Sequence, residues 1–201
     1  MKILITVLLT LIWIYVLRVT RKAELHSWRF IIGSFGLFAL LMVTARPALT
    51  MPLARMVAAI AGVFGKLTGM FASYYKYGII MVNSDSGGMT LLIDFECSGI
   101  LEIMVFVCLL VFFRAYTVWE KILVGILGTL YLIFSNVLRL VIICSMIHIW
   151  GVPAYYLAHT IVGRVAFFFM SLMLYFYVFT KAQVIRQKVG GFVYGNTDRA
   201  S

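Results

Sequence analysis

"EKILVGILGTLYLIFSNVLRLVIICSMIHI", residues 120–149, is a long apolar stretch with few charged residues. Its charged residues are Glu120 and Lys121 at the start and Arg139 in the second half. A helix over this range is about 45 Å long at about 1.5 Å per residue, whereas the hydrocarbon core of a bilayer is about 30 Å thick. The stretch therefore predicts a membrane helix that either protrudes from the bilayer or breaks near Asn136.

The composition of the whole chain extends this reading to all 201 residues. Hydrophobic residues make up 64% of the chain and charged residues 12%, whereas a soluble domain carries about 25% charged residues. Only helices and closed barrels satisfy their backbone polar groups in lipid, and long continuous apolar runs favour helices. The predicted fold is an all-α polytopic membrane protein, a bundle of five to seven membrane helices.

Four further apolar runs predict membrane helices, and a fifth run is ambiguous. In residues 51–72, Arg55, Lys66 and three glycines interrupt the apolar sequence. This run is either another span or a helix that lies at the interface or re-enters the membrane. The four clear runs occupy residues 3–17, 30–45, 99–113 and 159–180.

A short β-hairpin is predicted immediately before the helix that starts near residue 99. In residues 78–94, the β-prone runs "GIIMV" and "MTLLID" flank "NSDSGG", whose residues favour turns. Such a hairpin belongs outside the hydrocarbon, on the extracytoplasmic side, and it delivers the chain to Cys97. We expect residues 1–185 to form one integral membrane catalytic domain and residues 186–201 a polar cytoplasmic tail.

The distribution of basic residues predicts the orientation in the cell membrane. If residues 51–72 do not cross, the N-terminus is outside, and the cytoplasmic loops hold more Lys and Arg than the outer loops, as the positive-inside rule requires. The net charge of +10 then sets topology and meets anionic lipid, and no nucleic-acid partner is expected. The predicted cytoplasmic residues are Arg18, Arg21, Lys22, Arg29, Arg114, Lys121, Lys181, Arg186, Lys188 and Arg199.

Cys97, in "ECSGI", is the candidate nucleophile because it lies at the mouth of a predicted membrane helix. A helix N-terminus and nearby cations lower a thiol pKa, and Ser98 or Asp94 could cap the following helix. Glu96 and Asp94 act in the opposite direction. The alternative reading is a small residue buried at a boundary. Cys108 and Cys144 read as buried structural residues, and the absence of a CxxC pair argues against a redox enzyme.

Arg139, in "SNVLRL", is costly in a membrane helix and so needs a reason for its place. It either snorkels or forms an ion pair, or it places a fixed positive charge near a reacting anion. Asn136 is three residues earlier on the same helix face and could orient Arg139 or donate a hydrogen bond itself. His159, in "AHTIVG", is either a polar residue at a helix start or a general acid and base.

Under the predicted topology Cys97, Arg139 and His159 all lie near the outer face, although they are far apart in the chain. A thiolate at Cys97 could attack a carbonyl while His159 protonates the leaving amine. Arg139 would stabilise the thiolate or the oxyanion. Ser98, Asn136 and Glu96 are supporting candidates by position. The sequence does not decide the roles of Glu102 and Arg164.

Through these three motifs, in this order, the chain resembles the exosortase/archaeosortase family, as a compact single-domain variant. The resemblance covers roughly residues 80–170 and implies a membrane-embedded cysteine transpeptidase with Cys97, Arg139 and His159 as catalytic residues. It further implies substrates that are membrane-anchored exported proteins with a C-terminal sorting signal, made of a motif, a transmembrane helix and a basic tail. The acyl group then passes to an unidentified acceptor nucleophile, and no cofactor or metal is expected.

A non-enzymatic scaffold or transporter subunit of an export system is the alternative. That class needs polar groups lining a path through the bilayer centre. Here the ionisable residues gather at the ends of the predicted spans, which favours the enzyme.

Overall fold

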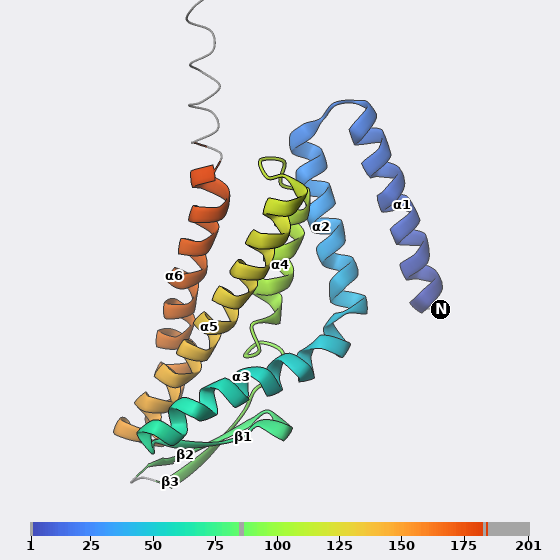
Figure 1. Cartoon of the computed structure of the whole chain (residues 1–201). Helices are drawn as coiled ribbons and strands as arrows, with labels where there is room; N and C mark the ends of the chain where they lie inside the picture. The colour runs from blue at the N-terminus through green and yellow to red at the C-terminus, as the bar shows by residue number, and fades with distance from the viewer. Residues whose placement is uncertain (1, 85–86, 183, 185–201) are drawn as a thin grey trace, which may run out of the picture.

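The computed structural model describes residues 2–84, 87–182 and 184, which are mostly helical (Figure 1). The predicted tail, residues 186–201, lies outside the described residues. The α-helices are α1 (Lys2–Lys22), α2 (His26–Thr44), α3 (Arg46–Thr68), α4 (Ile100–Phe112), α5 (Val118–Trp150) and α6 (Gly163–Tyr175). The strands are β1 (Phe71–Tyr74), β2 (Ile79–Ser84) and β3 (Gly87–Leu92). Two 3-10 turns, η1 (Tyr75–Tyr77) and η2 (Val152–Ala154), and two π-helical segments, η3 (Leu157–Val162) and η4 (Phe176–Lys181), complete the described elements.

Four helical segments in the described part of the chain are long and apolar enough to cross a membrane. They are His26–Thr44, Arg46–Thr68, Val118–Trp150 and the continuous rod Val152–Lys181. α4 is a shorter apolar helix of 13 residues, about 20 Å long at about 1.5 Å per residue. The predicted fold class, a helical membrane bundle with a small β element before the Cys97 helix, is confirmed.

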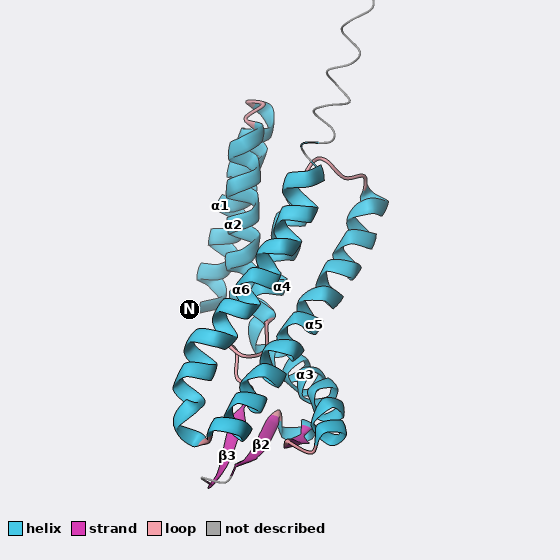
Figure 2. Ribbon diagram, turned by 90° about the vertical axis from the view of Figure 1, so that its left-hand side faces the viewer, coloured by secondary structure: helices cyan, strands magenta, loops and turns pink. Residues whose placement is uncertain are grey.

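The two ends of the bundle differ (Figures 1 and 2). The strands, the α2–α3 junction and the α5–η2 junction lie at one end, here called the sheet end. The α1–α2 turn, the α4–α5 loop and the end of η4 lie at the opposite end, here called the basic end. The basic end carries the described part of the predicted cytoplasmic set: Arg18, Arg21, Lys22, Arg29, Arg114, Lys121 and Lys181.

The ambiguous residues 51–72 belong mainly to α3, which runs across the sheet end instead of alongside the other helices (Figures 1 and 2). α3 ends at Gly69, whose φ of 71° is easily reached only without a side chain. One face of α3, made of small residues, is buried against the sheet: Ala54, Val57, Ala58, Ala61, Gly62 and Gly65. The direction and packing of α3 support an interfacial helix over a further span.

The predicted hairpin is present as β2 and β3, paired antiparallel from Ile79 opposite Leu92 to Ser84 opposite Gly87. The sequence did not predict β1, which adds a third strand in the order β1-β2-β3. The hydroxyl of Ser73 in β1 donates to the backbone carbonyl of Ala58 at 2.6 Å, which fastens the sheet to α3. A four-residue strand has too little periodicity to stand out beside a long apolar helix.

α5 is continuous through Asn136, so the first of the two predicted alternatives holds and this helix of 33 residues is longer than a bilayer core. α4 and the rod that contains α6 both pack on α5. Near the basic end these two elements also meet each other, through edge-on contacts of the Phe106 and Phe113 rings with Phe179. The hydroxyl of Tyr175 in α6 also donates to the backbone carbonyl of Glu102 in the first turn of α4 at 3.4 Å, and from there towards the sheet end a space remains between the two elements.

Candidate functional site

Cys97 lies in a tight turn that connects the sheet to α4. The backbone N–H of Cys97 donates to Asp94 Oδ1 at 3.0 Å, and the hydroxyl of Ser98 donates to the carbonyl of Phe95 at 2.9 Å. α4 begins after Gly99, which has a φ of 75° and receives no side-chain cap. The expectation that Asp94 or Ser98 caps α4 is therefore wrong, because both side chains stabilise the turn before it.

His159 lies against Cys97 although 62 residues separate them. The Cys97 Sγ is 3.1 Å from His159 Nε2, a distance over which a proton can pass between the two side chains. His159 is in the π-helical segment η3, and such segments often occur at functional sites. The ring of Tyr155 stacks on the imidazole, with centroids 5.3 Å apart, and limits its rotation.

Asn136 holds the Cys97 turn in place from α5. Its Nδ2 donates to the backbone carbonyl of Cys97 at 2.8 Å, and the side chain is fully buried. A Cβ on Gly99 would stand 3.2 Å from the Asn136 amide, so glycine is required there both by its φ and by this contact. Of the two roles foreseen for Asn136, hydrogen-bond donation is observed, and its partner is the backbone of Cys97.

Arg139 is one turn further along α5 and is 5% exposed. Its Nε has no hydrogen-bond partner among the described residues, and its guanidinium carbon is 5.7 Å from the centre of the Phe167 ring. The positive charge of Arg139 lowers the pKa of Cys97, so the two side chains are close enough to interact electrostatically. A buried cation with an unused N–H is suited to receive an anion or a polarised carbonyl.

Three acidic and basic groups surround this centre. Arg164 Nη2 is 3.9 Å from Glu96 Oε2, and both side chains are mainly exposed, so this ion pair contributes little to stability. Glu102 lines the space between α4 and α6, and its Oε2 is buried without a hydrogen-bond partner among the described residues. Arg164 thus pairs with Glu96 and not with Glu102, which settles one question that the sequence left open.

Burial raises the pKa of the Cys97 thiol to about 11, and the carboxylates of Asp94 and Glu96 raise it as well, against the lowering effect of Arg139. At pH 8 only about one thiol in a thousand is then ionised. Cys97 is therefore a neutral thiol at rest, not half of a preformed thiolate–imidazolium pair. Any reaction as a nucleophile requires its proton to leave during the attack.

Replacing Asp94 with asparagine will increase the rate at which Cys97 reacts with iodoacetamide at pH 8. Asparagine keeps the oxygen that accepts from the Cys97 N–H, but it removes the negative charge that raises the Cys97 pKa. Since one pKa unit changes the thiolate fraction about tenfold, we expect a gain of about three- to tenfold. Rates measured from pH 7 to 11 give the pKa directly. Glu24→Gln, at the opposite end of the bundle, is the control, and an unchanged rate in Asp94→Asn would contradict the assignment.

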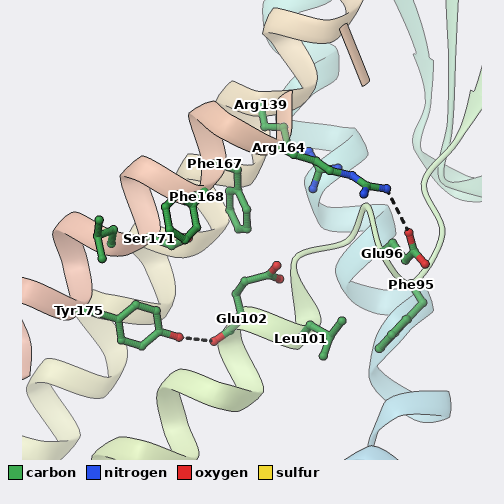
Figure 3. Close-up of a pocket in the computed structure, with 11 residues that line it drawn as sticks. Phe95, Glu96, Leu101, Glu102, Arg139, Arg164, Phe167, Phe168, Ser171 and Tyr175 are labelled. Carbon is green, nitrogen blue, oxygen red and sulfur yellow. Dashed lines mark hydrogen bonds and ion pairs between the residues drawn. The ribbon is translucent and has the colours of Figure 1, made fainter. Parts of the chain in front are cut away.

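Beside the Cys97–His159 pair is a cavity of about 550 Å³, here called the lateral groove, where α4 and α6 separate over α5 (Figure 3). Its polar lining residues face one another across an otherwise apolar space. The lining residues are Phe95, Glu96, Leu101, Glu102, Arg139, Arg164, Phe167, Phe168, Ser171, Leu172 and Tyr175. In the described part of the chain no group of three His, Cys, Asp or Glu residues is arranged to hold a metal ion.

A sequence model described as transmembrane exosortase (Exosortase_EpsH) matches residues 2–177, which is most of the chain. The chain belongs to the transmembrane exosortase family. Comparison with curated proteins and with solved structures returned no match. The contact between Cys97 and His159 at one end of the membrane bundle is consistent with a cysteine enzyme of this family.

Sequence reasoning on this exosortase family member found Cys97, Arg139, His159 and Asn136, and the fold brings these residues to one end of the bundle. It missed Ser171 and Tyr175, which line the lateral groove. Serine and tyrosine are common at helix positions of every kind, so neither residue carries a signal before the packing of α4 and α6 is known.

Proposed function

We propose that this exosortase is a membrane-embedded cysteine transpeptidase, with Cys97 as nucleophile, His159 as general base and acid, and Arg139 as the group that stabilises the oxyanion. The observation that carries the proposal is the 3.1 Å contact between Cys97 Sγ and His159 Nε2. Asn136, through the Cys97 carbonyl, and Ser98, through the turn, are positioning residues. Glu96 tunes the Cys97 pKa and holds Arg164.

In the first step the Cys97 sulfur attacks the carbonyl carbon of the scissile peptide bond while His159 Nε2 takes the thiol proton. The high resting pKa of Cys97 makes this transfer simultaneous with the attack. The carbonyl oxygen becomes an oxyanion near Arg139, whose unused Nε is available as a donor. Collapse breaks the C–N bond, the protonated imidazole gives its proton to the departing amine, and a thioester remains on Cys97.

In the second step an acceptor nucleophile attacks the thioester carbonyl. The neutral imidazole of His159 takes the acceptor's proton and returns a proton to the Cys97 sulfur as the carbon–sulfur bond breaks. The thiol is restored and the acyl group is bonded to the acceptor. Water in place of the acceptor gives hydrolysis with the same proton movements.

The substrates we infer are exported proteins that end in a short motif, a transmembrane helix and a basic tail. The basic end of the bundle fits the cytoplasmic side by the positive-inside rule. The site would then face the extracytoplasmic side of the cell membrane. A substrate anchored by its own helix meets the enzyme within the membrane, where the effective concentration is high, so little further binding energy is needed.

The experiment is a search for the acyl-enzyme. Secreted reporters bearing such tails, taken from proteins of the same cell, are co-expressed with the full chain, and the chain is analysed by mass spectrometry. We expect tail cleavage together with a hydroxylamine-labile adduct on Cys97, in the wild type and in Cys108→Ala alike. Tail cleavage that proceeds equally in Cys97→Ala, with no adduct in the wild type, would disprove covalent catalysis by this thiol.

A further inference from the structure

We propose that the lateral groove is the binding site for the start of the apolar helix of the substrate, which lies there beside the first turn of α4. This inference rests on the proposed function, because it takes a substrate with a membrane helix as given. It adds the place where that helix binds and the side from which it enters.

The groove lies next to the Cys97–His159 pair, although neither of these two residues lines it. Glu96 and Arg139 line it, Glu96 is next to Cys97 in the chain, and α4 begins three residues after Cys97. A substrate with its scissile bond at Cys97 must pass from an extended motif into a helix within a few residues. The enzyme's own path from β3 through Cys97 into α4 has this shape, and the groove lies beside the first turn of α4, where Leu101 and Glu102 line it (Figure 3).

The outer part of the groove suits an apolar helix that arrives from the lipid. Phe168 and Leu172 line the groove and remain 62% and 49% exposed. At the groove, the hydroxyl of Tyr175 on α6 donates to the backbone carbonyl of Glu102 on α4 at 3.4 Å, and this contact closes the groove on the side of the basic end. The exposed Phe168 and Leu172 side chains leave the rest of the space open sideways. A helix of the substrate can therefore enter by diffusion in the plane of the bilayer, without its apolar residues leaving the lipid.

Polar groups inside the groove favour a polypeptide over a lipid chain. Arg139 Nε and Ser171 Oγ have no hydrogen-bond partner among the described residues, and these side chains are 5% and 7% exposed. Glu102 Oε2 is also unpaired. An acyl chain offers these atoms nothing, whereas the first turn of a helix has free backbone N–H groups that a carboxylate and a hydroxyl can accept. The preceding residues offer carbonyl groups to Arg139.

The test is photocrosslinking in intact membranes, with a reporter tail that the wild-type chain cleaves and Cys97→Ala does not. p-Benzoylphenylalanine replaces Phe168 or Leu172 in the Cys97→Ala background, and the matched controls carry it at the neighbouring Phe169 or Met173. All four positions are exposed on α6, at 62%, 49%, 59% and 63%, but only the first two line the groove. We expect crosslinks to the apolar helix of the reporter from the groove positions, at least fivefold stronger than from the controls.

A second measurement uses chains with an active Cys97. Leu172→Trp fills the groove and should slow reporter cleavage about tenfold or more, while Met173→Trp should change it less than twofold. The alkylation rate of Cys97 should stay unchanged in both, which shows that the Cys97 turn is intact. Equal crosslinking from all four positions, crosslinks to lipid alone, or full cleavage by Leu172→Trp would overturn the groove assignment. Because the reporter is chosen for cleavage that needs Cys97, these results would leave the proposed function standing.

Discussion

Replacing Cys97 with alanine reduces reporter cleavage to the background rate, a loss of about 10³-fold or more, because the sulfur that forms the covalent intermediate is removed. Cys97→Ser should lose nearly as much. A hydroxyl ionises far less readily than a thiol, and burial beside Asp94 and Glu96 already opposes formation of the anion. The measurement is the fraction of reporter cut over time at matched enzyme levels in the membrane.

The controls are the two other described cysteines, which are buried and form no disulfide bond in the described part of the chain. Cys108 and Cys144 lie within α4 and α5, and replacing either with alanine removes one sulfur atom from the packing without touching the site. We expect cleavage within about twofold of the wild type in both variants. Normal cleavage by Cys97→Ala, or an equal loss in Cys108→Ala, would contradict the assignment of Cys97 as nucleophile.

Replacing Arg139 with glutamine lowers cleavage by about 10²- to 10³-fold, the usual cost of losing one group that stabilises an oxyanion. Glutamine is polar and shorter, and it lacks the charge. Arg139 is also the group that lowers the Cys97 pKa, so iodoacetamide alkylation of Cys97 at pH 8 should slow in the same variant. A loss of cleavage together with slower alkylation separates an electrostatic role from a general loss of folding, which would expose the thiol and speed its alkylation.

Arg164→Gln is the matched control for charge and chemistry. Arg164 lines the same groove, but it is mainly exposed, and its ion-pair partner among the described residues is Glu96. We expect cleavage within about threefold of the wild type. If Arg164→Gln costs as much as Arg139→Gln, the oxyanion role does not belong to Arg139 alone and the proposed division of labour is wrong.

The membrane helices were predictable because lipid imposes a requirement on sequence. A backbone in hydrocarbon must be helical or in a closed barrel, so each long apolar run predicts a helix. Residues 30–45 and 99–113 became α2 (His26–Thr44) and α4 (Ile100–Phe112), with boundaries that moved by at most a few residues. Helix boundaries are less certain because capping groups and turns decide them, and the start of α4 depends on Gly99.

α3 was the hardest element to predict. Its composition is that of a span, and by length and hydropathy it qualifies as one. Its course across the sheet end depends on contacts with β1, such as the hydrogen bond from Ser73 to Ala58. A hydropathy profile does not detect such contacts, because it evaluates each segment of the chain separately. The lateral groove was out of reach for a similar reason, since it exists only because α4 and α6 separate at one end of α5.

The helical membrane bundle follows from the amino-acid sequence alone. So does the choice of Cys97, Arg139 and His159 as side chains that need a functional reason, because a charged or polar group within an apolar run has a cost that is evident from the sequence. Only the tertiary structure decided that Cys97 meets His159, that Asn136 holds the Cys97 backbone and that Arg139 keeps an unused donor. Distances between helices are set by side-chain packing between residues far apart in the chain, and no local pattern encodes them.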